Sequence, residues 1–220
     1  MNSVHPLDKD QKDPEAFELP ELMTLRRTIT VGLILNRTKD YKGDTRLFGN
    51  AALTKAIERL TMDIGIDGLR YEIKREGRPH LVPDHQIRIS LSHTSGIICA
   101  TASLVEVGVD CEQIREFSPS LQRKMTDPHE LRRLGPVGDR LLTRIWCAKE
   151  AASKAVGLGL KLDFHRVQLF LGPRAADGRV DRTEQWYSSI DGRDDKFTIK
   201  LIEHDAYIIA LAEKEPNDNI

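Results

Sequence analysis

Apolar residues recur along this chain with two periods, which separates predicted strands from predicted helices. Apolar residues spaced at three and four predict a helix over 47–62, and a longer helix is predicted over 139–156. Ser118 and Asp127 each stand directly before a proline, which is a helix-start signal, and Glu130 completes a capping box after Asp127. Short apolar runs with the length of buried strands occupy residues 29–35, 87–91, 97–103, 107–114, 167–171, 197–203 and 207–212.

This order of elements predicts an α+β fold class. Residues 1–20 are polar and without periodicity, so we expect them to form a disordered tail. The rest divides into an N-terminal α+β half over 21–105, a C-terminal α+β half over 106–213 and a frayed tail over 214–220. The halves share a rough plan of strand, helical segment and strand pair, but no sequence repeat relates them.

Composition narrows the possible functions. The formal net charge is −1, from 33 basic and 34 acidic residues, which argues against a nucleic-acid-binding protein because such proteins usually carry a basic excess. The three cysteines form no C-x-x-C motif, so neither a zinc knuckle nor a disulfide framework is indicated. The sequence shows no signal peptide and no apolar run of ~20 residues, so we expect a cytoplasmic protein without a membrane partner.

Two motifs in the second half gather acidic and basic side chains. The run V-G-V-D-C-E ends at Glu112 and places Asp110 and Glu112 on one face of a predicted strand. The run W-C-A-K-E-A-A-S-K begins at Trp146 and places Glu150 and Lys154 on one face of a predicted helix. Three carboxylates and a lysine brought together suit a hard divalent cation bound to phosphate oxygens.

These motifs, in this order, resemble those of the 4'-phosphopantetheinyl transferases. The family pattern is G-[IV]-D-x-E followed by W-[STC]-x-K-E-[AS]-x-x-K. A third element matches upstream, with E-G-R-P at 76–79 and I-S-L-S-H-T-S-G at 89–96, where the family carries a basic residue before a proline and then a strand that ends in Ser-His. The resemblance covers residues 71–171 well and the first 70 residues poorly.

The resemblance implies a fold and a reaction. The fold is two similar α+β halves related by a pseudo-twofold, with coenzyme A in the cleft between them, as in the single-chain, surfactin-synthetase-activating type. The reaction is Mg²⁺-dependent transfer of 4'-phosphopantetheine from coenzyme A to a serine of an apo acyl- or peptidyl-carrier protein, with release of 3',5'-ADP. Such carriers serve fatty-acid, polyketide and nonribosomal-peptide biosynthesis. Since one chain supplies both sides of the cleft, a monomer is expected.

The resemblance also implies roles for the matching residues. Asp110, Glu112 and Glu150 would bind Mg²⁺. Glu150 has a second possible role as acceptor of the serine proton, and the two roles compete because a metal-bound carboxylate is a poor base. Asp110, Glu150 and Lys154 form the predicted catalytic set. The predicted contacts to coenzyme A are Arg78, Ser92, His93, Lys154 and Arg46.

Taken singly, these residues also have ordinary structural interpretations. Asp110 and Glu112 would lie on the wet face of an edge strand, and from that position Asp110→Ala is expected to abolish turnover while leaving the fold intact. Glu150 and Lys154 would form a surface i,i+4 ion pair worth a few tenths of a kcal/mol. His93 would be a surface residue at a turn. It is the combination of motifs that favours the site.

Some positions stay open at this point. Lys149 would point toward the substrate, into its own half or into solvent, and Trp146 would pack in the core or in the cleft wall. Lys39, Lys42 and Arg46 are the local candidates for holding the 3'-phosphate of coenzyme A, with a solvated basic loop as the alternative. These residues lie between the first predicted strand and the next helix. Only about a dozen residues, 36–47, fill this segment, where single-chain relatives usually carry a basic helix.

Two rival functions remain. The first is a non-enzymatic relative that binds coenzyme A or a carrier protein without turnover, which the short first half motivates. The intact set Asp110, Glu112, Glu150 and Lys154 argues against it. The second is an unrelated metal-dependent phosphotransferase or phosphatase, which would turn over without any carrier protein.

Overall fold

The computed structural model describes residues 15–18, 28–34, 45–75, 77–172 and 183–216. Within them lie two antiparallel sheets and a small hairpin of β3 (Glu72–Lys74) and β4 (His80–Val82). The first sheet has the order β1-β2-β6-β5, with strands β1 (Glu15–Glu18), β2 (Thr28–Ile34), β5 (Arg88–Thr94) and β6 (Ile97–Ser103). The second has the order β7-β11-β10-β9-β8, with strands β7 (Val107–Gln113), β8 (Val167–Leu171), β9 (Thr183–Ile190), β10 (Lys196–His204) and β11 (Tyr207–Lys214).

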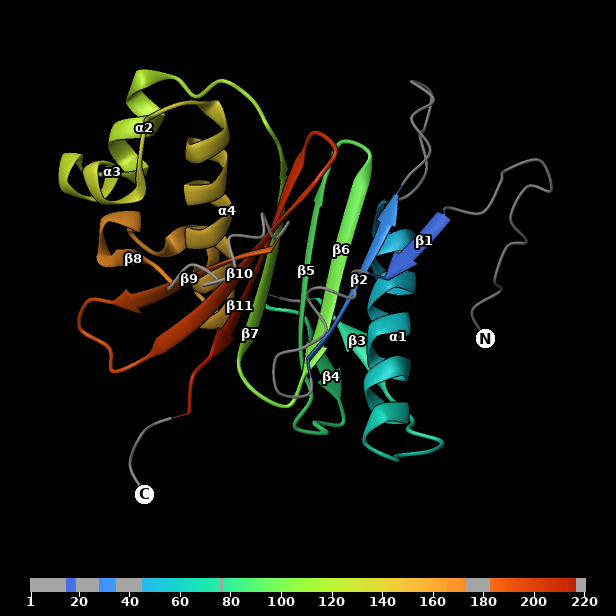
Figure 1. Ribbon diagram of the computed structural model, residues 1–220. Coiled ribbons are helices and arrows are strands. Elements are labelled where there is room, and N and C mark those ends of the chain that lie inside the picture. The colour runs from blue at the N-terminus through green and yellow to red at the C-terminus, as the bar shows by residue number, and fades with distance from the viewer. Residues whose placement is uncertain (1–14, 19–27, 35–44, 76, 173–182, 217–220) are drawn as a thin grey trace, which may run out of the picture.

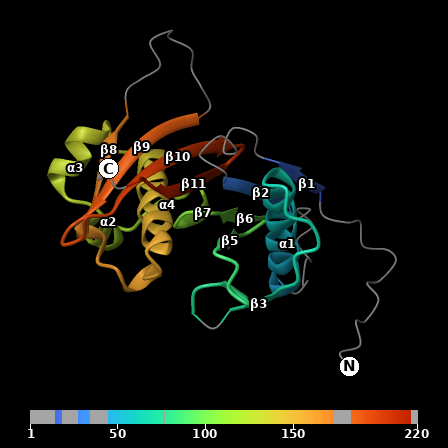
Figure 2. The same cartoon turned by 90° about the horizontal axis from the view of Figure 1, so that it is seen from below.

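A helix covers the outer face of each sheet. Figure 1 shows α1 (Thr45–Asp63) and α4 (Asp139–Ala155) on opposite sides of the molecule with the sheets between them. The shorter helices α2 (Pro119–Met125) and α3 (Pro128–Leu134) lie beside α4. Seen from below in Figure 2, the same order of layers holds. The α+β fold class is therefore confirmed.

The two sheets share part of their connectivity. In the first, β2 leads into α1, and the β5–β6 hairpin returns so that β6 pairs with β2. In the second, β7 leads into the helices that end in α4, and the β10–β11 hairpin returns so that β11 pairs with β7. Both pairings are antiparallel, and in each case the strand that precedes the helix lies next to the last strand of the hairpin.

An apolar layer between the sheets joins the two halves. It consists of alternate residues of β6, β7, β10 and β11, and its members are Ile97, Cys99, Val107, Val109, Cys111, Ile202, Tyr207, Ile209 and Leu211. Cys111 therefore faces this core, as a small apolar residue would. The intervening residues of β6 face α1, and those of β7 face α4. Each sheet is thus buried on both faces. One face packs against the helix of its own half, and the other forms the apolar layer that the two halves share.

The helix boundaries follow the capping signals. The hydroxyl of Ser118 accepts a hydrogen bond from the Leu121 N–H at the start of α2. The carboxylate of Asp127 accepts from the backbone N–H groups of His129 and Glu130 at the start of α3. Helix α4 ends where Gly157 adopts a positive φ of 76°, a conformation that glycine reaches without strain. The predicted helix starts after Ser118 and Asp127 are confirmed.

Other sequence-based boundaries need correction. The predicted disordered tail over 1–20 does not hold for Glu15–Glu18, which pair with β2 as strand β1. Strand β9 was not predicted, because its polar sequence T-E-Q-W-Y-S-S-I hides an alternation in which Trp186, Ser188 and Ile190 are buried. The predicted frayed tail begins later than 214, since β11 continues to Lys214. Among the described helices, none combines the length and apolar character that crossing a bilayer requires.

Candidate active site

Asp110 is the centre of the candidate site. It lies on β7, is buried, and its Oδ1 accepts hydrogen bonds from Ser92 Oγ at 2.7 Å and from Lys154 Nζ at 2.6 Å. Its other carboxylate oxygen, Oδ2, is buried without a hydrogen-bond partner. The alternative interpretation, in which Asp110 lies on the wet face of an edge strand, is therefore wrong, because α4 covers that face of β7.

Lys154 connects both halves at this point. Besides Asp110, its ammonium donates to Ser92 Oγ at 3.1 Å and to the Val109 carbonyl at 3.2 Å. Burial disfavours its charge, but the adjacent Asp110 outweighs that effect and raises the pKa of Lys154. The alternative of a surface ion pair between Lys154 and Glu150 is wrong, since the ammonium pairs with Asp110 instead.

Glu150 is a buried carboxylate of unusual character. Its Oε1 has no hydrogen-bond partner. Burial, followed by the negative charge of Asp110, raises the pKa of Glu150 from 4.5 to about 7, although Lys154 opposes the shift. Burial and Asp110 likewise raise the pKa of Glu112, against the opposing influence of Arg115. The two predicted motifs therefore meet in space as one acidic cluster.

The close approach of α4 to β7 brings these residues together. A Cβ added at Gly108 would clash with the Ala151 carbonyl oxygen and lie 2.6 Å from the Ala155 nitrogen. Helix α4 therefore rests directly on the β7 backbone, two residues before Asp110. Because side chains alternate along a strand, Asp110 shares the face of Gly108 and looks toward the helix. The glycine of the G-V-D motif thus sets the helix–strand distance that the cluster needs.

The cluster fits a hard divalent cation in its chemistry. Carboxylate oxygens are the ligands Mg²⁺ prefers, and two of them, Asp110 Oδ2 and Glu150 Oε1, are buried without a partner. As they stand, no three His, Cys, Asp or Glu side chains in the described ranges are arranged to hold a metal ion. The ammonium of Lys154 supplies the positive charge beside Asp110 in this arrangement. Binding a cation would therefore require the carboxylates to draw closer together.

The predicted contacts to coenzyme A lie at different distances from this cluster. Ser92 is part of it, and His93 follows on β5 with an exposed side chain. Arg78 donates from Nη1 to Glu106 at 2.6 Å and from Nη2 to the Val107 carbonyl at 3.3 Å, and its side chain borders Gly157 at the end of α4. Arg46 lies on α1, but its side chain is outside the described residues, as are Lys39 and Lys42.

Sequence reasoning missed the partner of Lys149. Its ammonium donates to Glu130 Oε2 at 2.7 Å and to the Phe164 carbonyl at 2.9 Å, and it is 1% exposed. The side chain of Glu130, which was predicted to close a capping box, faces Lys149 instead. The alternative in which Lys149 is exposed to solvent is wrong. Trp146 is half-buried and packs against Phe117 and Phe164 at the edge of a small apolar cluster. The one sequence signal for a buried Lys149 was its position among the alanines of the predicted helix.

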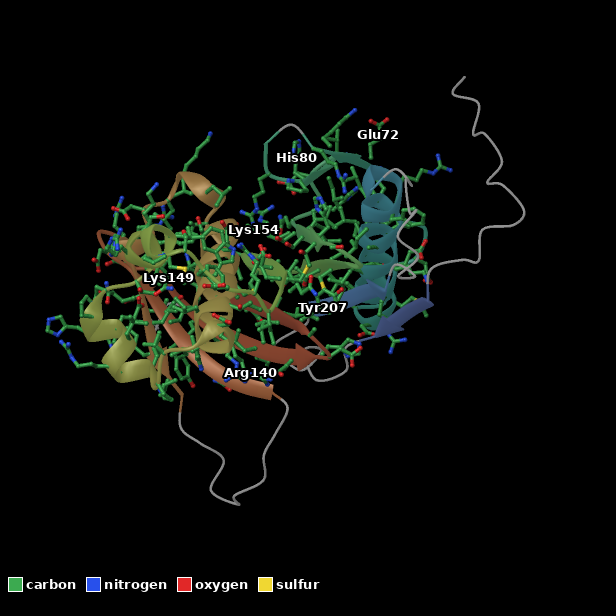
Figure 3. The ribbon with its side chains drawn as sticks, turned by 90° about the horizontal axis from the view of Figure 1, so that it is seen from above. Glu72, His80, Arg140, Lys149, Lys154 and Tyr207 are labelled. Carbon is green, nitrogen blue, oxygen red and sulfur yellow. The ribbon has the colours of Figure 1, made fainter. Side chains whose placement is uncertain are left out.

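Lys149 and Lys154 point into different parts of the molecule. Figure 3 shows Lys154 toward the junction of the halves and Lys149 inside the second half. Burial lowers the pKa of Lys149 and raises that of Glu130, and their mutual attraction opposes both shifts. Lys149 therefore belongs to the interior of the second half rather than to the acidic cluster.

The acidic cluster and its supporting helix lie in a segment with a recognised family pattern. Residues 106–212 match the family model of the 4'-phosphopantetheinyl transferase superfamily. The matched segment includes Asp110, Glu112, Glu150 and Lys154. Ser92, His93 and Arg78 lie before the matched segment. No curated protein sequence matches the chain.

Proposed function

We propose that this protein is a Mg²⁺-dependent 4'-phosphopantetheinyl transferase of the single-chain type. It transfers 4'-phosphopantetheine from coenzyme A to a serine of an apo acyl- or peptidyl-carrier protein and releases 3',5'-ADP. The observation that carries the proposal is the convergence of Asp110, Glu150 and Lys154 within the segment that matches the superfamily. A surface strand and a surface helix would have no reason to bring these three together.

The connectivity supports the two-halves type. Each half runs from a strand through a helix to a hairpin that returns to the first strand. The site also draws on both halves, because Ser92 of the first contacts Asp110 and Lys154 of the second. One chain then supplies both walls of the site, which favours a monomer.

The transfer forms a bond between the serine oxygen and the phosphorus that bears pantetheine, and breaks the bond from that phosphorus to the oxygen of 3',5'-ADP. Such reactions depend on positioning and charge neutralisation more than on covalent catalysis. Mg²⁺ held by Asp110, Glu112 and Glu150 would neutralise pyrophosphate oxygens. Lys154 binds a phosphate oxygen, and Arg78 and His93 bind farther along coenzyme A.

Glu150 has a pKa matched to proton transfer near neutral pH. A carboxylate with a pKa of about 7 accepts a proton far more readily than one with an ordinary pKa. It serves either as acceptor of the serine proton or as cation ligand, and the two roles compete. The pH–rate profile and the Mg²⁺ affinity of Glu150→Gln distinguish the two roles. If Glu150 is the base, the variant loses the acidic limb of the kcat profile and keeps its affinity for Mg²⁺. If Glu150 is a cation ligand, the affinity for Mg²⁺ falls.

The test is incubation with coenzyme A, Mg²⁺ and a panel of apo-carrier proteins, read by intact mass. One carrier class should gain a single phosphopantetheine, with 3',5'-ADP as coproduct, and a carrier whose acceptor serine is replaced by alanine should gain nothing. Coenzyme A binding without transfer to any carrier would favour the non-enzymatic relative. Release of 3',5'-ADP without a carrier would favour a metal-dependent hydrolase.

A further inference from the structure

A buried ion pair involves Lys149, which lies on α4 next to Glu150 of the acidic cluster. Lys149 Nζ lies 2.7 Å from Glu130 Oε2, and both side chains are 1% exposed. The same ammonium donates to the carbonyl of Phe164, in the short helix η3 (Phe164–Arg166), and Glu130 Oε1 accepts from the Leu169 N–H at 3.3 Å. The pair therefore ties α4 to α3, η3 and β8 at one point.

The large buried apolar side chains of α4, Leu142 and Ile145, lie in its first half. Around the site, the buried face consists mainly of small side chains, namely Cys147, Ala148, Ala151, Ala152, Ser153 and Ala155. Small side chains form low ridges that interdigitate little with a facing surface, so they allow close approach without fixing the rotation. Directional hydrogen bonds from Lys149 supply what this packing lacks.

The direction of Lys149 determines the direction of its neighbours. Successive residues on a helix differ by about 100°, so Lys149 and Glu150 project to different sides, while Glu150 and Lys154 share a side. With Lys149 bound to Glu130, the side of α4 that carries Glu150 and Lys154 faces β7. There the Lys154 ammonium lies 2.6 Å from the Asp110 carboxylate. A rotation of α4 that releases Lys149 would carry Glu150 and Lys154 away from Asp110.

We propose that Lys149 and Glu130 are positioning residues of the transferase, which hold α4 at the rotation that aims Glu150 and Lys154 at Asp110. This inference rests on the proposed function. A buried ion pair is often no more stabilising than apolar side chains of similar volume, so its contribution here is the specific orientation. Neither side chain touches the reacting groups, so both act through Glu150 and Lys154.

The paired variant Lys149→Met with Glu130→Leu separates positioning from stability. Its unfolding midpoint should stay close to that of the wild type, because the gain from removing two buried charges offsets the loss of the acceptor of the Leu169 N–H. Its kcat should fall about 100-fold, the usual effect of a misplacement near 1 Å, while KM for the carrier protein stays unchanged. Glu203→Gln is the control, because it removes the partner of Arg140 and Arg144 on the same helix, and should retain the wild-type rate within twofold.

A second readout works without turnover. Asp110→Asn should lower the unfolding midpoint of the wild type because Lys154 loses its partner, and should lower that of the paired variant much less because Lys154 is no longer aimed at Asp110. Equal losses in both backgrounds, or a stable paired variant with kcat within threefold of the wild type, would overturn the inference. An inactive wild type would overturn the proposed function alone, since the midpoint comparison still decides the positioning.

If the paired variant fails to fold, Glu130→Asp replaces it. This substitution keeps the charge but shortens the side chain by one methylene, so the pair persists only if α4 turns toward α3. We expect a kcat about tenfold lower with KM for the carrier unchanged. A folded Glu130→Asp protein with the wild-type kcat overturns the inference.

Discussion

At the residue scale, burial decides how the candidate site behaves. A surface i,i+4 pair between Glu150 and Lys154 would contribute about 0.3–0.5 kcal/mol. The ammonium of Lys154 instead satisfies a buried Asp110 and a buried Ser92. Removing a hydrogen-bonded partner from such a place costs more than removing one from a surface. Asp110 therefore contributes to the fold as well as to the proposed chemistry.

Asp110→Asn tests this double contribution. We expect activity to fall by ~100-fold or more, as for loss of a positioned charge. We also expect the free energy of unfolding to fall by about 2 kcal/mol, because Lys154 loses a charged acceptor. Urea unfolding at pH 7 measures the second effect, with Glu112→Gln as the control on the same strand. A midpoint unchanged from the wild type would show that the ion pair with Lys154 does not form.

Glu150 should make the metal-free protein less stable as pH rises. The unfolded state loses the proton near pH 4.5, whereas the folded state keeps it until about pH 7. Between these values the folded state binds more protons, so the free energy of unfolding falls by up to about 3 kcal/mol as pH increases. Urea unfolding in EDTA at pH 5 and pH 8 should show this loss in the wild type and a smaller loss in Glu150→Gln. Equal losses would show that the pKa of Glu150 is ordinary.

At the element scale, the spacing between α4 and β7 matters more than the composition of either. Helix α4 carries alanines on its buried face, and β7 carries a glycine beneath them. The helix therefore comes close enough for Glu150 and Lys154 to reach Asp110. The same reasoning explains why local signals found both elements and left their contact undetermined.

Gly108→Ala tests this close approach. The added methyl group meets the backbone of α4 at Ala151 and Ala155, which cannot rotate aside as a side chain would. We expect the free energy of unfolding to fall by at least about 2 kcal/mol, as in overpacked cores, together with activity. Gly138→Ala, at the N-cap of the same helix, meets nothing within 4 Å and should lower stability by no more than about 1 kcal/mol. Similar effects of the two substitutions would contradict the proposed packing.

At the scale of the whole molecule, the halves depend on each other. The apolar layer between the sheets includes residues from both. Polar contacts reinforce it, since Ser90 Oγ accepts from the Val109 N–H and the Tyr207 hydroxyl donates to the Ser95 carbonyl. Neither half would keep this layer out of water on its own.

The protein should therefore unfold as one cooperative unit. Both tryptophans, Trp146 and Trp186, lie in the second half, so their fluorescence reports that half, whereas far-ultraviolet circular dichroism reports both. The two probes should give the same urea midpoint, as expected for two-state unfolding. Separate midpoints would show that the halves are independent domains and that the layer between them contributes little.

The sequence by itself determined the elements, most of their boundaries and the acidic motifs, because these depend on residues close together in the chain. Periodicity located the strands that flank Asp110 and the helix that carries Glu150, and the capping residues Ser118 and Asp127 placed α2 and α3. It did not find β9, whose alternation is masked by polar residues, strand β1 in the predicted tail, or the three-residue strands β3 and β4.

Only the tertiary structure decided which charges pair. Lys154 was as compatible with Glu150 four residues away as with Asp110, and Lys149 as compatible with solvent as with Glu130. The outcome depends on burial and on segments distant in the chain, since Ser92 and Asp110 meet only where the two sheets join. Pairing of charges is set by the desolvation that packing imposes, and a one-dimensional pattern carries no information about that packing.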